Sequence, residues 1–544
     1  MMKKNFKKTM ALLLASCALT STMVACGPRG HGIDSHTIVF TVFNGGWGSA
    51  WAERAVNEWN SANAESTGYR IELNPNKDEW FTHQANLEAG TAIDDIYFSN
   101  ADYKWAYAKN AFEDLTDVWN STPTGESKTV MTKLKTNEKE FVDLIFKNPN
   151  DNKYYGLPLA TGLQGFIYDH DIFLQKGYLI ADEKTPDGKS KLITDPAQKL
   201  SAGRDKEYGT FDDGHPLNME EYNLMINAIA ATSNMYAYLW GGSYDYYFDS
   251  LNTTMIGDYD GYEALLGAIN LDFTYTNPVT KEVIQIKEDN GYEVYKMEGR
   301  RKWLNFLYDY VSNPLYYHPS SAKSTSHTDA QKKFVYGAAY KGTTADKQSA
   351  FLYDGIWWEN EARANFNSLS GRGDKSYTYG TRNYRMMMMP IIDEHQMEQD
   401  RYIVSTADDL NICVKKQKDP EKLKCIKNFL TYLYSDAKLL DIDNTTNMLV
   451  PFNYEATKEQ RAEMSVFGQN IRKIYESDKV QVFRRIVLDT YYKTSLREAY
   501  VDGKSVGYAV DAMLRGPGIV TKGNSTTIFD DTYTYFKNRW GDLR

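Results

Sequence analysis

The chain has 544 residues, of which 42% are hydrophobic and 25% are charged, a balance that excludes a disordered, collagen-like or coiled-coil protein. This length predicts about two to four domains, each able to bury a core without metal or disulfide bonds. The net charge is −10 at pH 7, and the first 25 residues contain four lysines and no acid, so the body is more acidic still; such a charge repels phosphate backbones, and we expect no nucleic-acid partner.

The N-terminus is typical of an export signal. Lysines at positions 3–8 precede an apolar or small run at 10–25, and the chain becomes polar after Cys26. This run is too short for a membrane span, and no later stretch reaches about 18 uncharged apolar residues, so we expect the mature chain not to cross a membrane. We expect residues 1–25 to be a signal peptide and residues 26–36 a polar tether.

Two cysteines are candidates for lipidation. Residues Met23–Cys26 resemble a bacterial lipobox, in which the cysteine becomes the lipidated first residue of the mature chain. Residues Leu14–Cys17 match the pattern more closely, but they follow the lysines by too few apolar residues. We therefore expect lipidation of Cys26, and a body that is extracytoplasmic and anchored to the bacterial cell membrane by this lipid alone.

The mature chain would retain only Cys413 and Cys425. A disulfide between them is conceivable, and two buried free thiols are an equal alternative. Neither has a metal-site partner at a suitable spacing, so we expect no metal and no cofactor. Two acidic turns, at 182–188 and 258–261, faintly resemble calcium loops without completing the twelve-residue pattern; we interpret them as ordinary turns and leave calcium open.

Strands and helices alternate along the body, which is typical of an α/β fold. Ser49 is expected to cap a helix that carries Trp51 and Trp59 on neighbouring turns. Before residue 160 we expect strands at 37–44, 69–73 and 93–98, helices from 50 and at 80–88, a segment of unassigned type at 102–109, and a strand-turn-strand region ending at 155–158.

The alternation restarts after Pro158. Gly177 is expected to close a short helix from 171, and Asn218 to begin another. The polar stretch at 180–216 predicts a surface insertion. The remaining expected elements are strands at 165–168, 236–240, 351–353, 385–389 and 410–414, helices at 303–311 and after 419, and a mostly helical remainder from 454.

Three loops after predicted strands share a composition rich in glycine and aromatic residues: Gly45–Trp47, Gly241–Tyr247 and Gly355–Glu361. Ligands of open α/β sheets bind at the carboxyl ends of strands, and aromatic faces beside polar groups suit a sugar. A lone tryptophan after a strand is more often core, and we assign Trp51, Trp59 and Trp303 to the core. For the three loops together, a shared cleft and separate positions in the core remain equal alternatives.

Several motifs, taken in order, resemble those of the extracellular solute-binding proteins of carbohydrate ABC importers, the maltose-binding-protein class. The resemblance extends from about Thr37 to Tyr454, and the order of the motifs is more specific than any one of them. Besides the lipobox and the first strand with its loop, the motifs are residues 94–98, 155–158, 165–173, 351–361, 386–390 and 419–435, with Asn453 beyond.

The resemblance implies a periplasmic-binding-protein-like fold of type II, in which two α/β lobes are joined by a multi-crossing hinge and hold the ligand between them. By position, the crossings are expected at 158–162, 394–403 and 450–453. The first lobe would comprise residues 37–158 and 403–450, and the second lobe residues 159–398 and 454–544. Extra segments at 180–216 and 251–298 make the chain more like the large-oligosaccharide receptors.

The resemblance also implies a set of ligand-binding residues: Trp47, Asn100, Asp102, Thr161, Tyr244, Tyr246, Trp357 and Trp358. We expect aromatic stacking to dominate affinity, and Asp102 and Glu359 to accept hydrogen bonds from sugar hydroxyls. Maltose binders have a charged residue where this chain has Gly45–Trp47, so the identity of the sugar is not predicted.

The expected function is that of a monomeric receptor that closes on a sugar or oligosaccharide and delivers it, unmodified, to the permease of an ABC transporter. One alternative is a receptor of the same architecture for oligopeptides or another solute. A second is an anchored glycoside hydrolase or lyase, whose two carboxylates would be Glu359 and Glu361. We interpret these acids instead as the start of a helix, and expect no enzyme.

Overall fold

A computed structural model of the chain describes residues 34–244, 247–340, 347–484, 498–515 and 524–543. The chain divides into two units, Met1–Thr37 and Ile38–Arg544, and the fold belongs to the second. Cys17, Cys26 and Tyr246, for which the sequence predicts lipidation or ligand contacts, lie outside the described residues. Among the helices that are described, none is long and apolar enough to cross a membrane.

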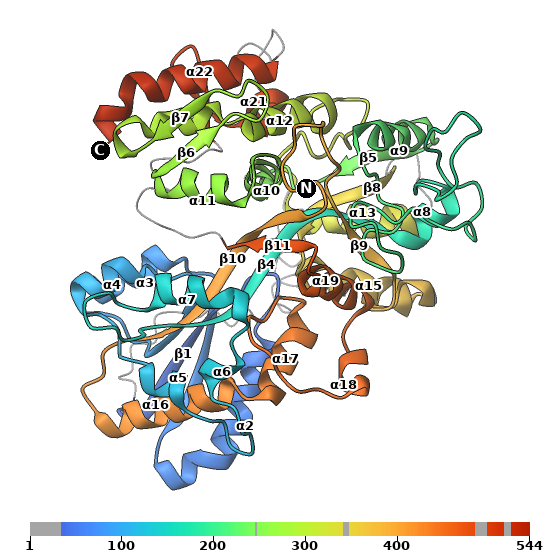
Figure 1. Cartoon of the computed structure of the whole chain (residues 1–544). Coiled ribbons are helices and arrows are strands. Elements are labelled where there is room, and N and C mark those ends of the chain that lie inside the picture. Colours follow the sequence, from blue (N-terminus) through green and yellow to red (C-terminus); the bar gives the residue numbers. More distant parts are fainter. Residues whose placement is uncertain (1–33, 245–246, 341–346, 485–497, 516–523, 544) are drawn as a thin grey trace, which may run out of the picture. The chain divides into compact units, whose positions relative to one another are not determined.

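One mixed sheet of nine strands connects the two halves of the fold (Figure 1). Its main order is β2-β1-β3-β10-β4-β8-β5, with β11 beside β10 and β9 beside β4. The strands are β1 Thr37–Phe43, β2 Arg70–Asn76, β3 Ile96–Ser99, β4 Leu157–Asp169, β5 Met235–Leu239, β8 Gln348–Gly355, β9 Tyr384–Met387, β10 Tyr402–Val414 and β11 Val480–Phe483. We call the part around β1–β3 the first lobe and the part around β5, β8 and β9 the second lobe. Two hairpins lie outside this sheet, β6 Phe273–Thr276 with β7 Val283–Ile286 and β12 Glu498–Val501 with β13 Lys504–Tyr508.

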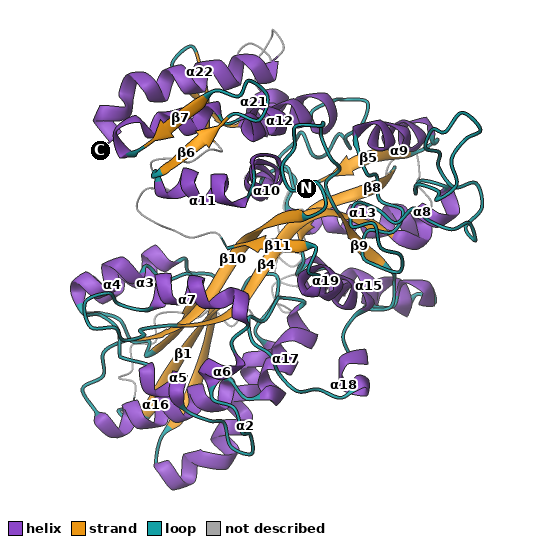
Figure 2. Cartoon of the chain, in the orientation of Figure 1, coloured by secondary structure: helices purple, strands orange, loops and turns teal. Residues whose placement is uncertain are grey.

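Helices pack along the strands of both lobes (Figure 2), with α2 against β2, α9 against β5, α13 against β8 and α10 against β10. The helices up to residue 270 are α2 Ala50–Thr67, α3 Trp80–Glu88, α4 Tyr103–Lys109, α5 Thr116–Asn120, α6 Val130–Lys133, α7 Lys139–Phe146, α8 His170–Lys176, α9 Met219–Ala231, α10 Phe248–Asp260 and α11 Tyr262–Asn270. The later helices are α12 Glu298–Phe306, α13 His327–Ala339, α14 Trp358–Glu361, α15 Arg363–Gly371, α16 Pro420–Leu433, α17 Asp436–Thr446, α18 Lys458–Ala462, α19 Val466–Glu476, α21 Ala509–Arg515 and α22 Asn524–Arg539.

Local sequence signals explain several of the helix ends. Asn218 begins α9 by accepting a hydrogen bond from the backbone N–H of Glu221, as predicted. Gly177 ends α8 at a φ of 71°, a conformation that costs glycine little. Ser49 does precede α2, but its side chain caps no backbone N–H and donates to Glu53 instead, at 3.2 Å. The predicted boundaries of these helices are therefore confirmed, although the predicted cap of α2 is wrong.

The long strands β4 and β10 are antiparallel neighbours and form the connection between the lobes. β10 pairs with β11 through Tyr402–Ser405 and with β3 through Asn411–Val414. Its partner changes between these two stretches, where the register against β4 also shifts. This change of partner lies between residues 405 and 411, after the crossing predicted at 394–403. β10 runs through both lobes as one strand, so its partners change in the middle of the strand and not before it begins.

One expectation about the added segments needs correction. The polar stretch at 180–216 is not purely a surface insertion, since Arg204 is fully buried and its Nη1 lies 2.6 Å from Oδ2 of Asp258. A buried guanidinium needs such partners, and the backbone oxygens of Glu398 and Gln399 supply two more. The remainder from 454 is mostly helical among its described residues, as predicted, and also contains β11 and the β12–β13 hairpin.

Buried apolar side chains form three clusters. The largest surrounds β1–β3 and continues past the hinge to Trp357 and Trp358. A second covers β5 and one face of β8, and a third lies between the β6–β7 hairpin and α22, where Trp540 is buried. The additional segment at 251–298 therefore has an apolar core of its own.

Candidate functional site

The loops predicted to bind ligand follow parallel strands within each lobe. In the first lobe Val42 of β1 pairs with Phe98 of β3, so the loop with Trp47 and the residues after Ser99 leave the sheet at the same edge. In the second lobe Leu239 of β5 pairs with Leu352 of β8, and the loops after these strands carry Tyr244 and Trp357. Each lobe thus presents two of the predicted loops together.

The loops after β1 and β8 contact each other directly. The rings of Trp47 and Trp357 meet edge to face, with centroids 5.5 Å apart and planes at 86°. Asn360 Nδ2 donates a hydrogen bond to the backbone oxygen of Gly46, at 2.9 Å. Trp47 Nε1 donates to the backbone oxygen of Phe43, at 3.1 Å, which fixes the orientation of its indole. Both tryptophans are only 4% exposed, so each covers the other across the two lobes.

Glycines make room for the Trp357 indole. A Cβ atom on Gly46, Gly162 or Gly355 would collide with this ring, and these glycines come from the loop after β1, from β4 and from the end of β8. Gly241 and Gly242 have another role, because Cβ atoms there would meet the backbone of residues 321–327. These glycines thus admit an indole ring and a backbone segment.

A polar cluster lies beside the two tryptophans and consists of His327, Gln331, Asp354 and Glu361. Nε2 of His327 lies 2.9 Å from Oε1 of Glu361. Nε2 of Gln331 donates to both carboxyl groups, at 2.7 Å to Glu361 and 3.0 Å to Asp354. The ring of Tyr244 packs against the His327 imidazole with centroids 4.8 Å apart. The third predicted loop therefore joins the site through His327.

Burial and charge set the protonation of this cluster. Asp354 is fully buried next to the negative charge of Glu361, and these two causes raise its pKa to about 7. The hydrogen bond with Glu361 raises the pKa of His327. Near neutral pH the cluster therefore holds protons that isolated side chains would have released.

Trp358 and Glu359, both predicted to bind ligand, face the protein interior instead. Trp358 is fully buried, and its ring contacts those of four neighbours: Phe334, Phe366, Tyr384 and Phe467. Glu359 is also fully buried, and Asn447 Nδ2 lies 3.4 Å from its Oε2. Burial raises the pKa of Glu359 to about 7. In this structure the first turn of α14 directs both side chains away from the loop that carries Trp357.

Thr161 has its hydrogen bonds within the hinge. Its Oγ1 donates to Oδ1 of Asp409, at 2.6 Å, and its backbone pairs with that of Leu449. Asp409 in turn lies 2.9 Å from Arg484, whose guanidinium is also 3.1 Å from Glu138. Thr161 is therefore a hinge residue here, engaged by protein partners rather than directed at a ligand.

Asn100 and Asp102 are exposed after β3. Asp102 caps α4 by accepting a hydrogen bond from the backbone N–H of Trp105, at 3.0 Å. Their edge of the sheet is that of Trp47, but within the described part of the chain neither side chain hydrogen-bonds to Trp47 or Trp357.

Solved structures with a similar fold identify the architecture. The sequence matches no family model, and no curated protein matches it. A chitin oligosaccharide binding protein is 16% identical over 94% of this chain and 100% of its own, with a TM-score of 0.57. The solute-binding protein RafE in complex with raffinose is 13% identical over 92% and 99%, with a TM-score of 0.53. The GacH receptor of Streptomyces glaucescens is 11% identical over 93% and 98%, with a TM-score of 0.54.

This chain has the two-lobe fold of solute-binding proteins. In that fold the Trp47–Trp357 contact lies between residues of opposite lobes, one following β1 and one following β8. The polar cluster belongs to the second lobe and borders the first at Gly46, because a Cβ atom on that glycine would lie 3.2 Å from the carboxyl carbon of Glu361.

The sequence analysis missed His327, Gln331 and Asp354 as site residues. Asp354 precedes Gly355 at the end of a predicted strand, so its position could have been recognised from the loop motif. His327 and Gln331 lie one turn apart on α13, far from the predicted loops in sequence. Only the packing of α13 against β8 brings them to the site.

No metal site is apparent in the part of the chain that the structure describes, where no three His, Cys, Asp or Glu side chains group suitably. Of the two acidic turns expected, residues 258–260 instead form the end of α10, where Asp258 pairs with Arg204 and Asp260 accepts hydrogen bonds from Tyr275 and from the backbone of Gly299. In the segment 182–188, Asp182 pairs with Lys199. Cys413 and Cys425 are buried free thiols, so the predicted alternative of a disulfide is not realised.

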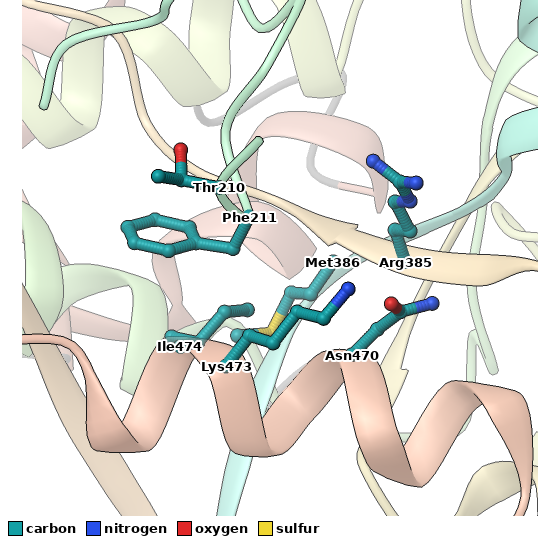
Figure 3. Close-up of a pocket in the computed structure, with 7 residues that line it drawn as sticks. All are labelled: Thr210, Phe211, Arg385, Met386, Asn470, Lys473 and Ile474. Carbon is teal, nitrogen blue, oxygen red and sulfur yellow. The ribbon is translucent and has the colours of Figure 1, made fainter. Parts of the chain in front are cut away.

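A separate hollow lies between the segment containing Thr210 and Phe211, strand β9 and helix α19 (Figure 3). Phe211 and Ile474 lie on one side of it, and Arg385 and Asn470 on the other. The amide of Asn470 already donates to the backbone oxygen of Tyr384, at 2.9 Å. The hollow contains none of the predicted ligand-binding residues.

Proposed function

We propose that the chain is an extracytoplasmic receptor that binds a sugar or oligosaccharide between its lobes and delivers it to the permease of an ABC transporter. A lipid on Cys26 holds it at the bacterial cell membrane. The observation that carries this proposal is the contact of Trp47 with Trp357, because two flat aromatic faces on opposite lobes, beside a hydrogen-bonding cluster, suit a saccharide ring.

Hinge movement about β4 and β10 would expose both indoles. A ligand that contacts both lobes favours the closed form and shifts the population toward it. An edge-to-face aromatic pair contributes about 0.5–1.5 kcal/mol beyond its buried area. This energy is small, so a saccharide that stacks on either ring can compensate for the lost contact between the indoles.

Similar solved structures support a saccharide as ligand. Two of them are described as bound to raffinose or acarbose, and a third as a chitin oligosaccharide binding protein. They also support binding without chemical change of the ligand, since each is described as a binding protein or receptor.

Thermal-shift measurements on the mature chain test the proposal against its main alternative. Neutral oligosaccharides and oligopeptides are screened separately, because a ligand present at 100 times its dissociation constant stabilises the folded state by about 2.7 kcal/mol. We expect the unfolding temperature to rise with an oligosaccharide. Shifts with peptides alone would identify a peptide receptor and contradict the proposal.

Product analysis tests whether the ligand stays intact. The mature chain is incubated for an extended time with the oligosaccharide that gives the largest shift, and the sugars are then separated by chromatography. We expect the starting oligosaccharide alone. Turnover that increases with protein concentration would identify an enzyme and contradict the binding function.

A further inference from the structure

The polar cluster forms one wall of the contact between the lobes. Glu361 borders Gly46 of the first lobe, and its neighbour Asn360 hydrogen-bonds to the backbone of that glycine. On its other side Glu361 holds His327, against which the ring of Tyr244 packs. A ligand held by Trp47 and Trp357 would therefore lie beside Asn360 and Glu361, with His327 next to Glu361.

The cluster contains two polar atoms that lack partners. Gln331 is fully buried, and its amide nitrogen donates to both carboxyl groups while its Oε1 has no hydrogen-bond partner. Nδ1 of His327 is likewise without a partner. Unsatisfied buried polar groups cost about 1–3 kcal/mol each. A hydroxyl group can both donate to the Gln331 oxygen and accept from a protonated imidazole, whereas a carboxylate can only accept.

The charges of the cluster also distinguish between ligands. Asp354 and Glu361 accept from the same amide nitrogen, and one of them, Glu361, is paired with His327. The repulsion between these two carboxyl groups contributes to the raised pKa of Asp354. Lys77 lies near enough to affect His327, but it is exposed, so water and salt screen its charge. Above the pKa of Asp354, a carboxylate brought by a ligand would be a third negative charge beside a single imidazolium and would add repulsion.

We propose that His327, Gln331 and Glu361 form the selective wall of the ligand site, and that this wall accepts neutral or amino-bearing saccharides and rejects acidic ones. This inference rests on the proposed sugar-binding function. It adds the charge class of the ligand and names residues outside the predicted set.

Matched pairs of ligands test the selectivity. Maltotriose, cellotriose and α-1,4-linked galactotriose are each titrated calorimetrically beside the trimer of the corresponding uronic acid. The protein is the mature chain, and its Glu361→Gln variant is measured in parallel. Glu263→Gln is the control, because Glu263 is exposed on α11 and the change in net charge is the same.

We expect a neutral trimer to bind on the order of tenfold more tightly than its uronic counterpart. The ratio of the two dissociation constants should be smaller in Glu361→Gln than in Glu263→Gln. Equal or tighter binding of the uronic trimer would overturn the inference while leaving sugar binding intact. If Glu361→Gln had the same ratio of dissociation constants as the wild type, the charge selectivity could not be assigned to this wall. Binding of no trimer, neutral or acidic, would contradict the proposed function itself and the inference with it.

Discussion

The indole of Trp47 meets the indole of Trp357 edge to face, at a centroid distance of 5.5 Å, although one follows the first strand of the first lobe and the other follows β8 of the second. The contact is supported by the hydrogen bond from Asn360 to Gly46. The two loops thus lie directly against each other. In the proposed receptor, the same surfaces separate to admit a saccharide.

The Gly162→Ala variant tests how closely β4 approaches the Trp357 indole. An added Cβ would collide with the ring, so the indole or the strand must move. We expect a loss of about 1–3 kcal/mol in the free energy of unfolding, the usual cost of overpacking, and weaker sugar binding. Gly371→Ala is the control, because a Cβ at the end of α15 meets nothing within 4 Å. Equal stability of the two variants in urea unfolding would contradict the packing.

The Arg484→Met variant tests the ion pairs at the hinge. Arg484 lies 2.9 Å from Asp409 and 3.1 Å from Glu138, and its removal leaves both carboxylates buried without their cation. We expect a loss of about 3–5 kcal/mol in urea unfolding. Lys424→Met, which removes an exposed ion pair with Glu421, should cost less than about 1 kcal/mol. A loss as small as this in Arg484→Met would show that the hinge does not depend on the network.

Asp260 makes stability depend on pH. Burial raises its pKa to about 7, so the folded chain keeps a proton that the unfolded chain releases above about pH 4. The contribution of Asp260 to the free energy of unfolding is therefore complete at low pH and is lost as the pH rises to about 7. The loss is roughly 4 kcal/mol at most.

Asp260→Asn removes this titration. We expect its free energy of unfolding to fall less between pH 5 and pH 8 than that of the wild type, as measured by urea titrations at each pH. Asp400→Asn, a change at an exposed carboxyl group, is the control and should keep the wild-type slope. If the free energy of unfolding of Asp260→Asn depended on pH as that of the wild type does, Asp260 would be ionised in the folded chain.

The Cys26→Ser variant tests the lipid anchor. Lipid attachment requires the cysteine thiol, so we expect this variant to leave the membrane fraction, while Cys17→Ser stays in it. Fractionation followed by mass spectrometry of the N-terminal peptide measures both. Retention of Cys26→Ser together with release of Cys17→Ser would assign the anchor to the other cysteine.

Much of the fold could be predicted because local patterns determine it. Trp80–Glu88 is a helix with the predicted bounds, and Gly177 and Asn218 mark helix ends through their own backbone or side-chain chemistry. The burial of Arg204 could not be predicted, because its partner Asp258 and the backbone of Glu398 lie far along the chain. A polar stretch is predicted to lie on the surface unless its distant partners are known.

The candidate site was predictable only in part, for a similar reason. The aromatic loops were recognisable from composition, and the structure brings Trp47 and Trp357 together. Adjacent residues of one motif have different surroundings, however, because a helix directs successive side chains to different sides. Trp357 therefore meets the other lobe while Trp358 fills the core. His327 reaches the site through tertiary packing alone.

A double-mutant cycle on Trp47 and Trp357 tests the central claim most directly. The dissociation constant of the oligosaccharide that gives the largest thermal shift is measured for Trp47→Ala, Trp357→Ala and the double variant, with Trp59→Phe as a control in the first-lobe core. We predict that each single variant binds on the order of tenfold or more weakly, that the two effects are not additive, and that Trp59→Phe binds as the wild type does. Folded single variants that both retain wild-type affinity would contradict a ligand held between these two rings.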